Sequence, residues 1–121
     1  MFLQNFQLWQ MLKMFDFSDY YDVGEYLVLI NNEAHIRSGI SRYYYSGFGY
    51  ARLYLINEMN EYEYISRHEI HKRVCERLME SKNDTESSIG EKLNELRIIR
   101  NEADYDWKLD RDYFLKKLSS V

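Results

Sequence analysis

The stretch that decides the fold lies in the C-terminal third of the chain, where residues 96–107 read LRIIRNEADYDW. Counted at about 100° per residue, a helix through this region brings five side chains within about 40° of one line. These are Leu93, Leu96, Arg100, Ala103 and Trp107. Because a guanidinium keeps its proton, burying Arg100 among apolar neighbours is costly unless it meets carboxylates, carbonyls, a second subunit or a bound anion. The stretch therefore predicts a helix with a charge in its apolar stripe.

The composition favours a single all-α domain. The chain has 121 residues, of which 45% are hydrophobic, and this is enough to bury one core. Proline is absent and glycine occurs only five times, so few residues would interrupt a helix. We therefore expect residues 1–121 to form one antiparallel bundle of four to five helices.

Charge and cysteine content narrow the classes of function. The formal net charge of -4 argues against a surface built wholly for nucleic acid, although it allows a local cationic groove. Cys75 is the single cysteine, so no disulfide can form within the chain, and a cytoplasmic location is expected. The first residues are apolar but carry glutamines, and no uncharged apolar window of about 18 residues exists. We expect neither a signal peptide nor a membrane span.

Periodicity and capping residues predict five helical stretches and a short last helix. They cover residues 2–15, 18–32, 38–59, 66–81, 87–107 and 110–118. Residues 1–16 are interpreted either as an N-terminal helix or as a docking arm. Ser66 and Glu69 have the spacing of a capping box at the start of the fourth stretch. The polar segment 81–88 predicts a loop.

The same periodicity predicts which side chains face the core. In the second stretch they are Val23, Tyr26, Leu27 and Ile30, and in the third they are Ile40, Tyr44, Gly47, Phe48, Ala51 and Leu55. The later stretches contribute Ile70, Val74, Leu78, Tyr113, Phe114 and Leu118. Glycine inside a helix costs about 1 kcal/mol, so the small residues Ser46, Gly47 and Gly49 indicate close helix packing.

Twelve tyrosines are many for 121 residues, and three of them are consecutive. Tyr43, Tyr44 and Tyr45 point in three directions around a helix, so at most two can face the core. One interpretation is ordinary aromatic packing with the hydroxyls reaching water. The other is stacking on nucleobases beside Arg42 and Arg52.

The histidines and the cysteine give weaker signals. His68 and His71 share one helix face and could hold a metal ion with a carboxylate, but no further ligands follow at a recognisable spacing. Surface positions are favoured for both, and we expect no metal site. His35 is placed near the C-terminal end of the second helix, where a cation is favourable. Cys75 is interpreted as a small, partly buried residue and not as a nucleophile.

Two interpretations of Arg100 and Asn101 stay open at this point. In the first, Arg100 forms a structural ion pair with Asp104 one turn later, or with Asp22 or Glu25 of another helix. In the second, the buried charge marks a functional site that binds an anion.

Two segments together resemble the HEPN domain family, which consists of small helical bundles from prokaryotic nucleotide-related and defence systems. The first segment resembles the signature helix of the family in Ser41-Arg42, Tyr44-Tyr45, Phe48, Ala51-Arg52 and Leu55. The second resembles its other signature in Leu96, Arg100, Asn101 and Ala103-Asp104-Tyr105. With the helix order, the resemblance covers most of residues 19–118.

The resemblance implies a bundle that dimerises, with the arginine motifs of two subunits meeting in a cleft. Many HEPN proteins are metal-independent ribonucleases in which an arginine, a polar residue and a histidine act on the scissile phosphate. Arg100 and Asn101 match the start of that motif, whereas Tyr105 stands in the histidine position. A tyrosine with an ordinary pKa near 10 is a poor base at neutral pH. Asp104 could replace it only if Arg100 offset the repulsion between this carboxylate and a phosphate.

The resemblance also bears on partners. Some HEPN proteins are paired with a small nucleotidyltransferase that modifies a tyrosine two residues beyond the motif histidine. Trp107 stands at the corresponding position here, so that modification does not carry over.

The sequence thus predicts a cytoplasmic homodimer that binds RNA, a nucleotide or a nucleotidyltransferase partner, in a toxin–antitoxin or defence context and without a cofactor. The candidate catalytic residues are Arg100, Asn101, Asp104 and Tyr105, and the candidate binding residues are Arg42, Tyr45 and Arg97. One alternative is a metal-independent ribonuclease toxin with an atypical motif. Another is a non-catalytic interaction module that holds a partner through Phe2, Phe6 and Trp9.

Overall fold

The computed structural model describes residues 15–121, and this part of the chain contains helices and no strand. Its elements are α2 (Ser18–Val28), α3 (Glu33–Asn57), the 3₁₀ turn η1 (Tyr62–Ile65), α4 (Ile70–Met79), α5 (Asp84–Tyr105) and α6 (Arg111–Ser120). The predicted all-α class is confirmed for these residues. The predicted N-terminal helix or docking arm lies, apart from its last two residues, outside them. None of the described helices is both long and apolar enough to cross a membrane.

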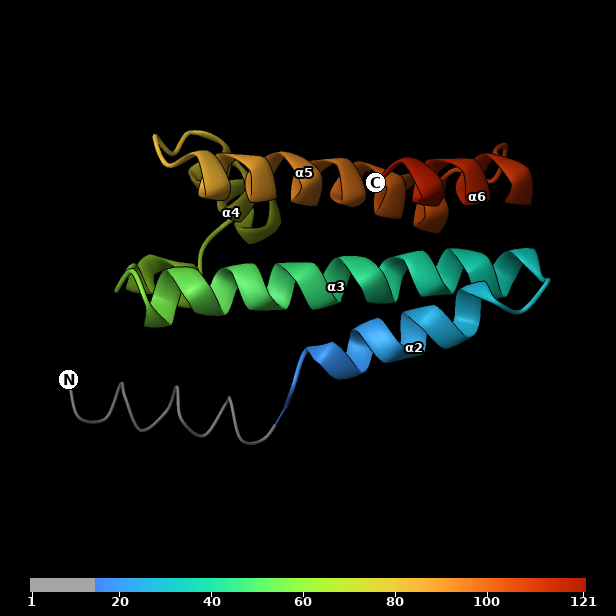
Figure 1. Ribbon diagram of the computed structural model, residues 1–121, viewed down its shortest axis with the longest axis horizontal. Helices are drawn as coiled ribbons and strands as arrows, with labels where there is room; N and C mark the ends of the chain where they lie inside the picture. Colours follow the sequence, from blue (N-terminus) through green and yellow to red (C-terminus); the bar gives the residue numbers. More distant parts are fainter. Residues whose placement is uncertain (1–14) are drawn as a thin grey trace.

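The long helix α3 forms the centre of the arrangement (Figure 1). α2 lies antiparallel along one side of it, and α5 runs antiparallel to it on the other side. α4 packs mainly against α5, near the C-terminal end of α3. α6 turns back after α5 and contacts both α5 and α3. The described helices therefore form an antiparallel bundle.

Two hydrophobic clusters lie along α3. The first core cluster joins α3 to η1, α4 and the first half of α5, and it contains Tyr44, Phe48, Ala51, Leu55, Ile56, Tyr64, Val74, Cys75, Leu78 and Leu93. The second core cluster joins α3 to α6 and the second half of α5, and it contains Ile36, Ile40, Ile99, Ala103 and Phe114. The predicted inner face of α3 is confirmed at Ile40, Tyr44, Phe48, Ala51 and Leu55, which are all buried, whereas Gly47 is only partly buried.

Glycines, not large apolar side chains, bring α2 against α3. The predicted core positions Val23 and Tyr26 are wrong, because these side chains are 44% and 69% exposed. Gly24 is buried instead, and a Cβ atom there would lie 2.8 Å from the ring of Tyr43. The close packing predicted at the small residues of α3 is confirmed at Gly49, where a Cβ atom would lie 2.2 Å from the ring of Phe17.

Three helices begin at a side-chain cap, and two of them, α3 and α5, begin several residues before the predicted start. Asn32 accepts a hydrogen bond from the backbone amide of His35, so α3 begins at Glu33 and not at residue 38. Asn83 caps α5 in the same way, so α5 begins at Asp84, three residues before the expected start. Asp110 caps α6, which begins at Arg111, one residue after the predicted start of the last helix. Each cap satisfies a backbone amide that would otherwise lack a partner.

The predicted capping box at the start of the fourth helix is wrong. The helix begins at Ile70, Glu69 has a left-handed φ of 54°, and no side chain caps it. Ser66 is extended because η1 ends just before it. Arg52 donates hydrogen bonds to the carbonyls of Tyr64 and Ile65, and these bonds hold η1 against α3.

Two further positions differ from the predicted helix limits. α5 ends at Tyr105, so Trp107 leaves the apolar stripe and is 82% exposed. His35 lies in the first turn of α3 and not at the C-terminal end of a helix, and its ring also contacts the Asn32 side chain. The favourable dipole interaction expected for His35 is therefore wrong.

Candidate functional site

Arg100 on α5 is buried, as the apolar stripe predicts, and only 9% of it is exposed. Its one described ion pair joins Nη1 to Asp104 at 3.6 Å, one helical turn later. Asp22 and Glu25, the other carboxylates considered from the sequence, do not pair with it. The Nε atom is buried and has no hydrogen-bond partner among residues 15–121. Such an orphaned donor typically costs about 1–3 kcal/mol and calls for an explanation.

Two tyrosines of α3 form the aromatic side of this site. The guanidinium carbon of Arg100 lies 5.0 Å from the ring centre of Tyr44 and 5.5 Å from that of Tyr45. The guanidinium carbon of Arg42 lies 5.3 Å from the ring centre of Tyr45 and also packs over the ring of Tyr20. Both tyrosines therefore take part in cation–π contacts with arginine. Aromatic packing is confirmed for the buried Tyr44, whereas Tyr45 stays partly accessible.

His71 reaches the same place from α4. Its Nδ1 atom is 2.8 Å from the hydroxyl of Tyr44, and its ring stacks on Phe48 and meets the edge of Tyr45. The surface position favoured for His71 is therefore wrong, although His68 is exposed as expected. We name Arg42, Arg97, Arg100, Tyr44, Tyr45 and His71 the arginine cluster.

The electrostatics of the arginine cluster reflect its positive charge. Burial lowers the pKa of His71 below its ordinary value, and three guanidiniums lower it further. These belong to Arg100, Arg52 and Arg97. Burial raises the pKa of the Tyr44 hydroxyl, so this group keeps its proton. At neutral pH the arginine cluster thus combines a neutral imidazole and a neutral phenol with fixed guanidinium charges.

Arg97 and Cys75 lie at the edge of the cluster. Arg97 donates from Nε and Nη2 to the side-chain oxygen of Asn94 at 3.2 and 2.9 Å. Cys75 is fully buried, and this burial raises the pKa of its thiol. The interpretation of Cys75 as a small packed residue is confirmed.

The structure divides the predicted site residues between two places. Arg42, Tyr45, Arg97, Arg100 and Asp104 lie in or beside the arginine cluster. Asn101 and Tyr105 instead line an open depression of about 720 Å³ together with Trp107, and Tyr105 is 75% exposed. The sequence motif is thus continuous along α5, but its side chains point to different surroundings.

Sequence reasoning missed the part that His71 plays in this site. The signal for its partial burial was available, since His71, Val74 and Leu78 follow one helical face and the latter two were predicted to be buried, but this spacing does not indicate the contact with Tyr44. No group of three histidine, cysteine or acidic side chains within residues 15–121 is arranged to hold a metal ion.

Two partly buried arginines have structural partners. Arg77 forms a double hydrogen bond with Glu61 and also pairs with Glu86. Arg37 donates to the backbone carbonyls of Ala103 and Asp106 at 2.9 Å, and so terminates α5. Arg100 differs from both because its described partners leave a buried donor unused.

Comparison with known proteins identifies no relative of this chain. No protein-family model, curated protein or solved structure matches this chain. The resemblance to HEPN domains therefore rests on the two sequence segments alone, while the helical bundle is observed directly.

Proposed function

We propose that this protein is a HEPN-like homodimer that binds RNA through phosphate groups at the arginine cluster, without efficient cleavage. The observation that carries the proposal is the incomplete pairing of Arg100, which is buried with only Asp104 and two aromatic rings as described partners. A phosphate supplies the charge and the acceptor atoms that the guanidinium lacks.

The surroundings of Arg100 support an anionic ligand. Arg42 and Arg97 add two positive charges, and Asp104 is the one carboxylate found within ion-pair distance of Arg100 in the described chain. A local cationic site is compatible with the formal net charge of -4. Binding of this kind releases counterions, so its affinity should decrease as salt increases.

Tyr45 supports RNA as the source of the phosphate. Its ring is partly accessible and lies among Arg42, Arg100 and His71. Stacking of a base on an aromatic ring contributes about 1–3 kcal/mol and tolerates many sequences. A single strand could therefore place a phosphate near Arg100 and a base on Tyr45.

The homodimer in this proposal comes from the HEPN resemblance and has indirect support. Tyr105 and Trp107 are 75% and 82% exposed at the end of α5, and large exposed aromatic side chains often mark protein interfaces. Light scattering coupled to size-exclusion chromatography tests the dimer, because a monomer at all concentrations would contradict it.

The binding test compares Arg100→Gln with Arg111→Gln. Arg111 is a matched control because it removes the same charge from α6, where its partners are Asn31 and Asp112. With a fluorescently labelled single-stranded RNA, we expect Arg100→Gln to weaken binding about 10- to 100-fold, since hydrogen bonds to charged groups contribute about 1.5–3 kcal/mol. Arg111→Gln should stay within about twofold, as expected for a charge outside the site.

Two further arms identify the ligand and the charge effect. Asp104→Asn should tighten RNA binding, because it removes the carboxylate that competes with phosphate for Arg100. Unlabelled mononucleotide serves as competitor, and displacement at low concentration would indicate a nucleotide site instead of an RNA site. Equal RNA affinity of the parent, Arg100→Gln and Arg111→Gln would overturn the proposal.

A ribonuclease is the second candidate, and His71 is the observation that favours it. The motif on α5 has Tyr105 in place of its histidine, but His71 on α4 brings a neutral imidazole to Tyr44 and Tyr45. A neutral imidazole can accept a proton near neutral pH. Cleavage of transfer or messenger RNA that resists a chelator and is lost in both His71→Gln and Arg100→Gln would favour this enzyme over a binding protein.

A further inference from the structure

We propose that His71 is a second phosphate-binding residue of the arginine cluster, and that its imidazole takes up a proton when RNA binds, so that RNA affinity rises as the pH falls. This inference rests on the proposed RNA binding and deepens it, because it makes the proton a second ligand of the same site. Three observations carry it: the position of the imidazole near Arg100, the unbalanced positive charge around both groups, and the hydrogen bond between His71 and Tyr44.

His71 and Arg100 lie against the same two aromatic rings. The ring centre of Tyr44 is 5.6 Å from that of His71 and 5.0 Å from the guanidinium carbon of Arg100. The corresponding distances from the ring of Tyr45 are 5.7 and 5.5 Å. The imidazole and the guanidinium are therefore no farther apart than the sum of two such contacts, which is close to the Debye length of about 8–10 Å at physiological salt. A phosphate bound to Arg100 would thus act on His71 electrostatically.

The charged groups that act on His71 are positive. They are guanidiniums from two helices, Arg52 on α3 and Arg97 and Arg100 on α5. The other titratable groups around the ring are two phenols of α3 and a thiol one turn later on α4, and they belong to Tyr44, Tyr45 and Cys75. Within residues 15–121 no acidic side chain pairs with His71, and the nearby Asp104 pairs with Arg100. Burial and the guanidiniums lower the pKa of His71, and a phosphate on Arg100 would offset the effect of the guanidiniums.

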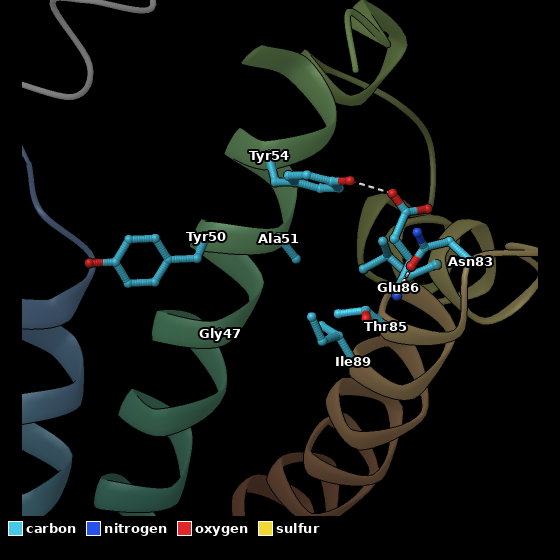
Figure 2. A pocket seen from close by; sticks show the side chains of 9 residues that line it. Gly47, Tyr50, Ala51, Tyr54, Asn83, Thr85, Glu86 and Ile89 are labelled. Carbon is cyan, nitrogen blue, oxygen red and sulfur yellow. Dashed lines mark hydrogen bonds between the residues drawn. The ribbon is translucent and has the colours of Figure 1, made fainter. Parts of the chain in front are cut away.

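Buried charge at the start of α5 is, by contrast, compensated by its neighbours. Figure 2 shows Tyr54 donating a hydrogen bond to Glu86 at a cavity of about 630 Å³ between α3 and α5. Glu86 also accepts a hydrogen bond from Ser81 and pairs with Arg77, so its carboxylate is satisfied within the protein. The arginine cluster instead combines positive charges with the buried, unpartnered Nε atom of Arg100. We therefore expect an anion at the arginine cluster and not at this cavity.

The contacts of the imidazole hold it in place in both charge states. Its Nδ1 atom lies 2.8 Å from the Tyr44 hydroxyl, and its ring stacks on that of Phe48 with 4.1 Å between the ring centres. An imidazolium donates from both nitrogens and accepts from neither, so the Tyr44 hydroxyl must accept this bond once His71 is charged. The His71 side chain is only partly buried, so Nε2 can serve as a charged donor to a phosphate while Nδ1 stays bonded to Tyr44.

The direction of the pH dependence follows from linkage. Because a bound phosphate favours the charged imidazole, the complex holds more protons than the separate protein, and RNA affinity increases as the pH falls. The increase begins near the ordinary histidine pKa of about 6.5 and ends where the free protein is itself protonated, below its lowered pKa. One partly screened charge at this separation should tighten binding about 3- to 10-fold between pH 7.5 and pH 5.5.

The test measures the affinity for a fluorescently labelled 2′-O-methyl oligouridylate by anisotropy at pH 7.5 and pH 5.5. Its bases do not titrate in this range, and it lacks the 2′-hydroxyl nucleophile that cleavage requires. The parent should bind about 3- to 10-fold more tightly at the lower pH. His71→Gln, whose amide can still bond Tyr44, should change by less than about twofold. The matched control His68→Gln removes an exposed imidazole three residues earlier and should respond as the parent does.

A second measurement needs no substitution of His71. The chain has three histidines, and His35 and His68 are both exposed. Replacing these two by glutamine leaves His71 as the single imidazole, and an NMR titration of its ring protons then reports its pKa directly. Bound oligouridylate should raise this pKa by about 0.5 to 1, which is the equivalent of the expected change in affinity. Circular dichroism at both pH values verifies that each variant is folded.

The outcomes separate this inference from the proposed function. If binding is lost in Arg100→Gln but has the same pH dependence in the parent and in His71→Gln, the role of His71 is refuted and the RNA site stands. A pKa of His71 that does not rise on binding refutes this role as well. If the oligouridylate binds at neither pH, the proposed function and the inference both fail.

Discussion

Replacing Arg100 by methionine should stabilise the ligand-free protein, although Arg100 is among its most buried polar residues. The change removes an ion pair with Asp104, which contributes roughly 0.3–0.5 kcal/mol between residues one turn apart, and cation–π contacts with Tyr44 and Tyr45 of about 0.5–1 kcal/mol each. It also removes an orphaned donor that costs about 1–3 kcal/mol and a desolvated guanidinium that costs several more. We expect the free energy of unfolding to rise by about 1–2 kcal/mol.

The assay is urea unfolding in a chloride buffer without phosphate or sulfate, because an anion bound to Arg100 would mask the effect. Arg37→Met is the matched control. Arg37 also packs over an aromatic ring, that of Phe114, but it donates to the carbonyls that end α5. Its loss should lower the free energy of unfolding by about 2–4 kcal/mol. If Arg100→Met lowered it by a similar amount, Arg100 would be a structural residue and the reasoning on the arginine cluster would fail.

Three other measurements test the local chemistry. Because the folded protein lowers the pKa of His71, the unfolded chain binds a proton at this residue more readily. The free energy of unfolding should therefore be undiminished by His71 above about pH 6.5 and should decrease as the pH falls below this value. Urea unfolding of His71→Gln should show a smaller decrease over the same pH range. Cys75, buried and with a raised pKa, should react with iodoacetamide only as fast as the protein opens, so a rate equal to that of a free thiol would contradict its burial. Gly39→Ala places a Cβ atom 2.7 Å from Val28 and should lower the free energy of unfolding by about 1–3 kcal/mol. In Gly47→Ala the new Cβ atom meets only the flexible end of Leu93 at 3.3 Å, so this change should be neutral or stabilising. Equal effects of the two glycine changes would argue against close packing of α2 and α3.

Helical periodicity was sufficient for the parts of the fold in which large apolar side chains set the packing. It located the buried face of α3 and the burial of Phe114 on α6. It failed for α2, because the contact with α3 is made by Gly24 and Gly39, which carry no hydrophobic signal. It also failed at Trp107, since a helical period says nothing of where the helix stops.

The site was predictable along one helix and unpredictable between helices. The burial of Arg100 and its pairing with Asp104 follow from spacing on α5. The contact between Tyr44 and His71 joins residues 27 positions apart in the sequence, so only the packing of α4 against α3 could reveal it. Asn101 and Tyr105 show the converse. They directly follow Arg100 and Asp104 in the sequence, but they line a separate depression, because successive residues of a helix point in different directions.

Arg100 occupies the boundary between the two core clusters, with Leu93 in the first and Ile99 in the second. Apolar contacts propagate cooperativity, and an incompletely paired charge interrupts them. Amide hydrogens near Phe114 and near Val74 should therefore exchange with different opening free energies, as members of separate folding units. An anion that completed the pairing of Arg100 would join these units, so ligand binding in this small bundle would be read out as a change in how the whole chain opens.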